Sequence, residues 1–258
     1  VPTSALNCVI NDVVNDPVIS AGVAVCKSLT IGTGILTMTG GQLEIYGSFI
    51  NTGTFSQGTR PLIFRDNGTV ATSQSVNNGN GTLNNIQFNK LAGGSVSVDA
   101  AVLNVTTLVT FGANNFNFVV PSSKILSAIG GITVNGGTLT VQSGGTVEIG
   151  SGQTLTVSGG TVTTTGTNDV YPQSLSNKGT FTRRGGSGTW NFTATSGTVN
   201  LVGFIFEWLG TNGLNIGGTT NVSAINGGQL RSLPPTAGMR AIQLNTTGAL
   251  PSVISNFG

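Results

Sequence analysis

Between residues 136 and 162 the chain repeats one short unit, a glycine-containing break followed by four residues that begin with threonine. Apolar and polar residues alternate in most of these units, which predicts a short strand with one buried and one exposed face. The breaks contain glycine and serine, which favour tight turns. The stretch therefore predicts a series of short strands that turn every seven or eight residues. The four units are TLTV, TVEI, TLTV and TVTT, beginning at Thr138, Thr146, Thr154 and Thr161.

Strands of this kind can form hairpins or stack as the coils of a solenoid. The breaks lack the two-residue Asn-Gly and Asp-Gly loops that promote hairpins. Three strands and three turns span about 23 residues, from Thr138 to Thr161, which matches the repeat length of known solenoids. The sequence therefore predicts an all-β, parallel β-helix (β-solenoid) with about 20–25 residues per coil. In this arrangement Thr138 lies beneath Thr161, ~4.8 Å away along the axis.

Comparable units occur elsewhere in the chain, including SLTI, ILTM, QLEI and SFIN between residues 28 and 51. No long window shows a helical period, although residues 121–131 fit either one helical turn or a strand. Because composition does not shift along the chain, we expect residues 1–258 to form a single solenoid domain. Its length suggests eleven or twelve coils and a rod on the order of 50–60 Å long.

Composition excludes several classes of protein. Only 7% of residues are charged, the net charge is +2, and 38% are hydrophobic, which is unlike a disordered chain. The basic residues are scattered, so no nucleic-acid partner is expected, and the adjacent pair Arg183–Arg184 suits a solvated turn. The longest apolar run, near residues 201–209, is too short for a transmembrane helix.

The two cysteines, Cys8 and Cys26, lie close to the beginning of the sequence. They can be free thiols or a disulfide, and we expect a disulfide that staples residues 1–30 as an N-terminal cap region. A disulfide indicates an oxidising compartment, and the start VPTSALNC fits a mature secreted protein. The sequence therefore predicts a secreted, extracellular or cell-surface protein. The chain contains no histidine, and two cysteines alone do not indicate a metal site.

Two segments resemble large repetitive surface proteins of Bacteroidetes-type bacteria. They are CKSLTIGTGILTMTGGQLEIYGSFINTGTFSQGTRPLIF and GTLNNIQFNKLAGGSVSVDAAVLNVTTLVTF, within residues 26–111. The resemblance implies a right-handed coil and an exported protein that serves as an adhesin, gliding or filament component. It brings no catalytic residues with it.

An enzymatic function is not expected. Glycosidases need paired carboxylates and some lyases need a carboxylate cluster that holds calcium, but the eight acidic residues are scattered. Glu44 and Asp66 are spaced by about one coil, which is more often coincidence than a site. The chain has no histidine for general base catalysis and no phosphate-binding loop. We therefore expect no catalytic residues, no metal and no cofactor.

Three functions remain, and the leading one is a non-enzymatic structural or adhesive solenoid, a stalk, fibre or filament segment. The sequence stops in mid-pattern at VISNFG, which suggests part of a longer or polymeric assembly, with self-association end to end.

The alternative function is a polysaccharide-binding or polysaccharide-degrading β-helix. Its contacts with surface glycans would come from Tyr171, Arg183, Arg184 and Trp190. The alternation of residues favours a core position for Trp190, as it does for Trp208, and leaves the position of Tyr171 open.

Ice binding is the third function, because rows of Thr-x-Thr can order water. The TLT and TVT units at residues 138, 154 and 161 supply such rows. Glu148, in the unit between the first two, is expected to interrupt a flat array, and the rows do not persist along the sequence. These two observations rank ice binding below the other functions.

Overall fold

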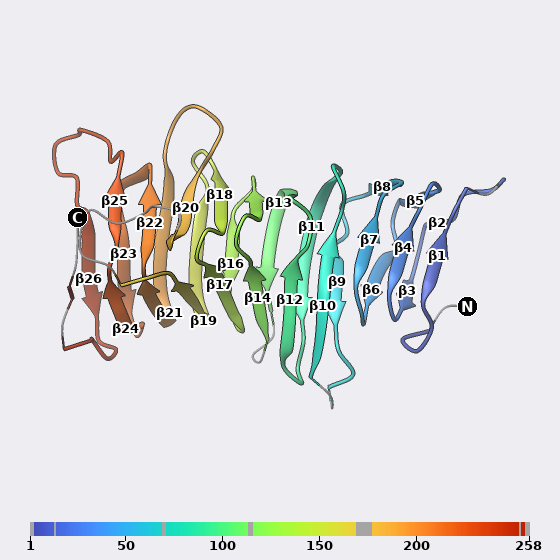
Figure 1. Cartoon of the computed structure of the whole chain (residues 1–258), viewed down its shortest axis with the longest axis horizontal. Helices are drawn as coiled ribbons and strands as arrows, with labels where there is room; N and C mark the ends of the chain where they lie inside the picture. The colour runs from blue at the N-terminus through green and yellow to red at the C-terminus, as the bar shows by residue number, and fades with distance from the viewer. Residues whose placement is uncertain are drawn as a thin grey trace.

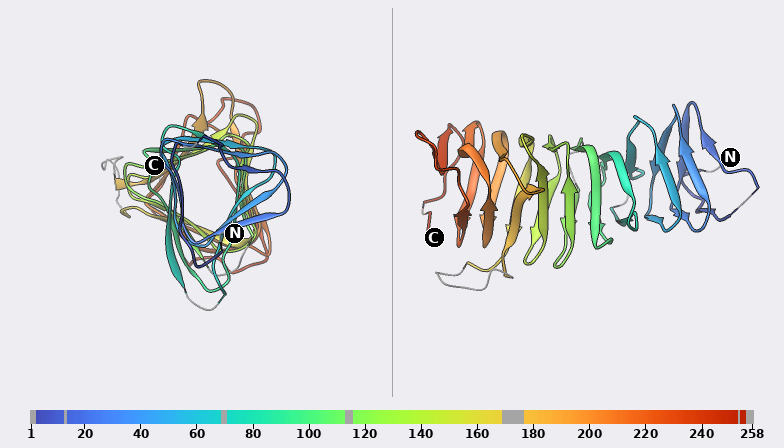
Figure 2. Two further views of the ribbon diagram at one scale, coloured as in Figure 1. Left: turned by 90° about the vertical axis from the view of Figure 1, so that its right-hand side faces the viewer. Right: turned by 90° about the horizontal axis from the view of Figure 1, so that it is seen from above.

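The chain winds into a parallel β-solenoid of about nine turns (Figure 1). The computed structural model describes residues 3–12, 14–68, 71–112, 116–168, 177–252 and 254–255. Seen along the axis, successive turns superpose and enclose one continuous core (Figure 2). This confirms the predicted all-β solenoid. Each full turn carries strands on three sides, named face 1, face 2 and face 3 in the order in which the chain visits them.

The strands of face 1 form an unbroken parallel ladder along the whole rod. They are β1 (Cys8–Ile10), β4 (Leu29–Ile31), β7 (Phe49–Asn51), β10 (Thr72–Asn77), β12 (Gly94–Val98), β14 (Asn117–Val120), β17 (Thr138–Gln142), the second halves of β19 (Thr154–Thr165) and β21 (Trp190–Val202), and β24 (Asn221–Asn226).

Face 2 is divided into two ladders. The strands β2, β5 and β8 form a separate three-stranded sheet, and the ladder resumes with β11. The strands of face 2 are β2 (Val18–Ile19), β5 (Ile35–Met38), β8 (Thr54–Gln57), the first halves of β11 (Thr82–Asn89) and β13 (Val102–Phe111), β15 (Ile125–Ala128), β18 (Thr146–Gly150), β20 (Gly179–Arg184), β22 (Phe204–Glu207) and β25 (Gln229–Arg231).

Face 3 completes each turn and is again a continuous parallel ladder. Its strands are β3 (Val23–Cys26), β6 (Gln42–Ile45), β9 (Leu62–Arg65), the second halves of β11 and β13, β16 (Ile132–Val134), the first halves of β19 and β21, β23 (Leu209–Gly218) and β26 (Ile242–Thr246).

The predicted register is confirmed at the repeated stretch, where Thr138 pairs with Thr161. The predicted number of coils was too high, because two turns are longer than the repeat. Phe49 pairs with Val76 one turn later, and Thr161 pairs with Thr198, 37 residues further on. Nine turns give a rod about 45 Å long. Residues 121–131, left open between helix and strand, contain the strand β15.

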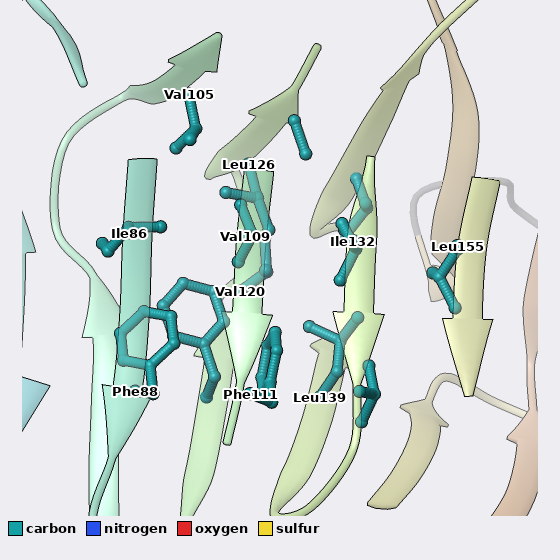
Figure 3. Packing of buried hydrophobic residues seen from close by; sticks show 14 of the residues in the cluster. Ile86, Phe88, Val105, Val109, Phe111, Val120, Leu126, Ile132, Leu139 and Leu155 are labelled. Atoms are coloured by element: carbon teal, nitrogen blue, oxygen red, sulfur yellow. The ribbon is translucent and has the colours of Figure 1, made fainter. Parts of the chain in front are cut away.

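Inward side chains from the three faces form a dry core. On face 3 they align in columns, of which Ile86, Val109, Ile132 and Leu155 form one (Figure 3). All four are fully buried, so each coil packs its apolar residues on those of the next coil. Burial of aligned apolar side chains, together with stacked backbone hydrogen bonds, is what stabilises a fold whose coils contact only their neighbours.

The predicted disulfide is wrong, because Cys8 and Cys26 are both free thiols. Cys8 lies on face 1 and pairs with Leu29, whereas Cys26 lies on face 3 and pairs with Ile45. Their strands thus belong to different ladders, and the side chains are neighbours without a bond. Burial, followed by the neighbouring Cys8, raises the pKa of Cys26 to about 12, so this thiol stays protonated and unreactive at neutral pH.

Within the described ranges no helix is long and apolar enough to cross a membrane.

Candidate functional site

Face 2 carries one outward column of polar side chains in adjacent coils. Glu148 on β18 pairs with Thr182 on β20, and the Thr182 hydroxyl donates a hydrogen bond to Glu207 Oε2 on β22 at 3.1 Å. Glu207 in turn pairs with Arg231 on β25. In a chain with only 7% charged residues, this concentration of charge on one side of the rod marks a candidate binding surface.

Both carboxylates of this column form ion pairs with arginines. Glu148 Oε2 lies 2.7 Å from Arg184 Nη1, and Glu207 Oε1 lies 3.4 Å from Arg231 Nη2. The arginine side chains are 42% and 39% exposed, so each pair contributes little to stability, about 0–1 kcal/mol. Their main effect is to hold four charged groups in fixed places beside the solvent.

Arg183 and Trp208 form the centre of this surface. The guanidinium carbon of Arg183 lies 3.7 Å from the centroid of the Trp208 ring, the geometry of a cation–π contact. Arg183 Nη1 also donates a hydrogen bond to the carbonyl oxygen of Gly188 at 2.7 Å. The planar cation is therefore held by both a ring and a carbonyl. We name the six residues Glu148, Arg183, Arg184, Glu207, Trp208 and Arg231 the Trp208 platform.

Trp208 packs against the core but keeps part of its surface exposed, and its backbone leaves the strand conformation. Its φ is 63°, a left-handed value that costs a bulky residue roughly 1–2 kcal/mol. Phe204 and Phe206 of β22 point into the core and are fully buried, whereas Trp208, in the turn after Glu207, is only partly buried. The alternation of Phe204, Phe206 and Trp208 predicted core packing for Trp208, and this is confirmed in part, because the residue packs against the core without being fully buried.

The structure places only some of the predicted glycan contacts at the candidate surface. Arg183 and Arg184 lie on the platform. Trp190 does not: it is fully buried, and its indole Nε1 donates a hydrogen bond to the Glu207 carbonyl oxygen at 2.8 Å, so its assignment as a glycan contact is wrong. Tyr171 lies outside the described residues.

Sequence reasoning missed Glu207 and Trp208. The turn between Thr161 and Thr198 is 37 residues long and breaks the regular spacing of the repeat. Glu148 and Glu207 are 59 residues apart in the sequence, so the repeat length does not predict that they lie close together. The apolar pattern of β20 and β22 is the signal that could have predicted this contact. Aligning Phe181 with Phe206 in the two strands also aligns Thr182 with Glu207.

Glu44 and Asp66, spaced by about one coil in the sequence, have separate structural partners. Glu44 forms an ion pair with Arg65, with Oε2 2.8 Å from Nε. Asp66 instead accepts hydrogen bonds from the backbone N–H groups of Gly68, Leu91 and Ala92, each at 3.0 Å. Both groups therefore hold neighbouring segments together. Across the described part of the chain, no group of three or more Cys, Asp and Glu side chains is placed to hold a metal ion.

Lys90 and Lys178 are buried, with at most 2% of their surface exposed, and both have structural partners. Lys90 Nζ donates to Thr72 O, Thr72 Oγ1 and Gln74 Oε1 at 2.8–3.2 Å. Desolvation lowers the pKa of Lys90, an effect that Asp66 opposes. Lys178 Nζ donates to the Gly227 carbonyl oxygen at 2.8 Å. These cations tie coils together rather than facing a ligand.

The threonine rows lie on different faces from Glu148. Thr138 and Thr161 belong to face 1, whereas Glu148 stands in the ladder of face 2. The expected interruption by Glu148 was therefore wrong. On face 3 an outward column of threonine persists through four successive coils, and it consists of Thr110, Thr133, Thr156 and Thr193.

The first coil leaves the core open. A cavity of about 590 Å³ lies there, lined by Ile10, Ile19, Ala24 and ten neighbours that are mostly apolar. At the opposite end Leu230, Ile242 and Leu244 pack on the core but stay partly exposed. Among the described strands, β1, β2 and β3 each pair on one side only, as do β25 and β26. Both ends thus combine unpaired backbone edges with incompletely buried apolar side chains.

Comparison with protein-family models, with curated proteins and with solved structures finds no match to this chain.

Proposed function

We propose that the protein is a non-enzymatic structural rod of a cell surface or extracellular fibre, which lengthens by stacking further copies end to end. The observation that carries the proposal is the pair of incomplete ends. The first coil presents edges of all three faces and the last coil presents edges of faces 2 and 3, and inward residues at both ends lack the next coil that would bury them. Free strand edges beside apolar surface favour pairing with another chain.

The parallel direction of all the strands sets the geometry of this contact. On face 1, β24 already donates to the Ala249 carbonyl oxygen through Val222 N and pairs with Ser255 through Asn226. A parallel ladder can continue only when the last coil of one copy meets the first coil of the next. The same docking places β26 against β3 and β25 against β2. The contact is therefore head to tail, which forms open fibres rather than closed dimers. This arrangement supports a role as a stalk, fibre or filament segment, exported as the resemblance to surface proteins implies.

Blocking one end at a time tests the proposal. Ile19 lines the cavity at the first coil, and Leu244 packs on the core at the last coil. We expect Ile19→Asp and Leu244→Asp each to abolish oligomers of the 258-residue chain in sedimentation velocity and fibres in electron microscopy, because a buried unpaired carboxylate is costly. Mixed together, the two variants should form a 1:1 dimer that grows no further, since one functional end of each kind remains.

The neighbouring outward residues provide matched controls. Val18, 57% exposed on β2, and Asn245, exposed on β26, can carry aspartate without entering the contact, so Val18→Asp and Asn245→Asp should assemble as the original chain does. Circular dichroism identifies any variant that fails to fold. A monomeric original chain at high concentration, or a homodimer of either blocked variant, contradicts head-to-tail assembly.

A second candidate function, ordering of water or ice, is favoured by the face 3 threonine column. If the column binds ice, the protein slows ice growth, and Thr156→Lys in the middle of the column abolishes the effect because a long charged side chain displaces ordered water. Thr146→Lys, an outward change on face 2, is the control and should leave activity intact. The measurement is thermal hysteresis, and its absence in the original chain rejects this candidate.

A further inference from the structure

We propose that the Trp208 platform binds an acidic polysaccharide, with the Arg183 guanidinium receiving a carboxylate of a sugar unit. This binding function does not require end-to-end assembly, because Arg183, Trp208 and both glutamates precede the last coil; only Arg231 lies on β25 at the docking end. It requires a cation that is free for a ligand, acceptors for sugar hydroxyls and an open surface along the axis.

Arg183 supplies the free cation. It forms no ion pair within the described part of the chain, whereas Arg184 and Arg231 each have a carboxylate partner. Its contact with Trp208 and its hydrogen bond to Gly188 use the ring-facing side and one nitrogen of the guanidinium. A guanidinium carries five N–H donors in a planar fork that matches a carboxylate, so donors remain for an anion. Because the group is already held in place, binding loses less side-chain entropy.

Glu148 and Glu207 restrict which anions fit. Both carboxylates are about one fifth exposed, and they stand in one outward column with Thr182, the residue before Arg183, between them. A carboxylate accepts hydrogen bonds from sugar hydroxyls but repels a neighbouring negative charge. A dense polyanion such as nucleic acid would place phosphates against both glutamates. A saccharide with one carboxylate and several hydroxyls per unit places donors there instead, which selects a uronic-acid polymer.

The conformation of Trp208 indicates that a partly exposed aromatic ring is needed in this place. Glycine or asparagine occupies a left-handed turn at lower cost than tryptophan, and Ser232 occupies the corresponding turn one coil later with a φ of 52°. The turn itself therefore does not require an aromatic residue. What the indole adds is a rigid base for the Arg183 guanidinium and an apolar edge against which a sugar ring can pack.

The surface is extended rather than concave, which suits a polymer. Five of its residues come from four successive strands of face 2, β18, β20, β22 and β25, and Trp208 directly follows β22, so it follows the axis of the rod. The partly exposed Arg184 and Arg231 stand toward the two ends of this surface, where each can exchange its glutamate partner for a carboxylate of the ligand. Several weak contacts along one chain then add up to useful affinity.

Isothermal titration calorimetry of the full chain with oligomers of polygalacturonate tests the proposal, with neutral dextran as the comparison ligand. We expect binding of polygalacturonate but not dextran. Arg183→Gln should weaken it about 10- to 100-fold, because a charge-assisted hydrogen bond is lost. Trp208→Asn, which suits the left-handed turn, should weaken binding by a similar factor. Trp208→Phe should retain most of the affinity.

Controls separate a site from a general attraction to anions. Arg60→Gln removes an exposed positive charge from the turn between β8 and β9 and should leave affinity unchanged. Thermal unfolding should show that Arg183→Gln stays folded. The proposal is overturned if polygalacturonate does not bind, or if Arg60→Gln weakens binding as much as Arg183→Gln. Tighter binding of dextran sulfate that both variants reduce equally would likewise show attraction by net charge alone. Since the end-blocked variants keep the platform, their monomers should bind as the original chain does, so failure of assembly and failure of binding are distinguishable.

Discussion

Phe88→Ala is expected to reduce the free energy of unfolding by about 3–5 kcal/mol. Phe88 is fully buried and contacts the rings of Phe64, Phe111, Phe116 and Phe118, with centroids 4.7–5.6 Å apart. It therefore joins three successive coils; Figure 3 shows Phe88 and Phe111 among the buried side chains. Urea unfolding measures the loss, and hydrogen exchange should show faster opening of β9 and β13 as well as β11.

The adjacent residue provides the control for this prediction. Gln87 points outward from the same strand, and its side chain donates to Asn89 Oδ1 at 3.1 Å. Gln87→Ala should therefore cost no more than about 1 kcal/mol. Similar losses for the two variants would mean that β11 does not present Phe88 to the core.

Gly94→Ala is expected to destabilise the protein by roughly 2 to 5 kcal/mol, through two separate effects. Gly94 has a φ of +86°, and a Cβ added there would overlap the carbonyl oxygen of Thr72 in the coil below. The left-handed conformation contributes about 1–2 kcal/mol and the overlap about 1–3 kcal/mol. Chemical unfolding of the variant measures the combined cost.

Gly152→Ala separates the two effects. Gly152 has a similar φ of +75°, but a Cβ there would meet no atom within 4 Å. This variant should lose only the conformational part, about 1–2 kcal/mol. If Gly94→Ala were no more destabilising than Gly152→Ala, the close approach of β12 to the coil below would be refuted.

The fold could be predicted because the local pattern is repeated with a constant spacing. Alternation identified the short strands, and the distance between Thr138 and Thr161 gave the coil length that their pairing shows. The spacing failed where turns are longer, as between Thr161 and Thr198. Long loops leave the ladder intact but change the sequence distance between stacked residues, so the number of coils was overestimated.

The candidate surface was less predictable, because its residues meet only through stacking. Successive units of the repeated stretch stand on different faces, so Glu148 does not share a surface with the threonines on either side of it. Arg183 and Arg184 could be named from their positive charge, whereas Trp208 depends on one left-handed backbone angle. Periodicity cannot show such an angle when the residue is neither glycine nor asparagine.

The stacking of coils in constant register also bears on how such a chain can change over generations. Because Thr138 pairs with Thr161 and Leu139 pairs with Val162, a duplicated or deleted segment of one coil length joins the ladders again without moving any side chain to another face. Rod length can then change in single steps of about 4.8 Å, while outward columns are only lengthened or shortened. Insertions such as the 37-residue turn occur at corners, so new surface loops can arise without rebuilding the core.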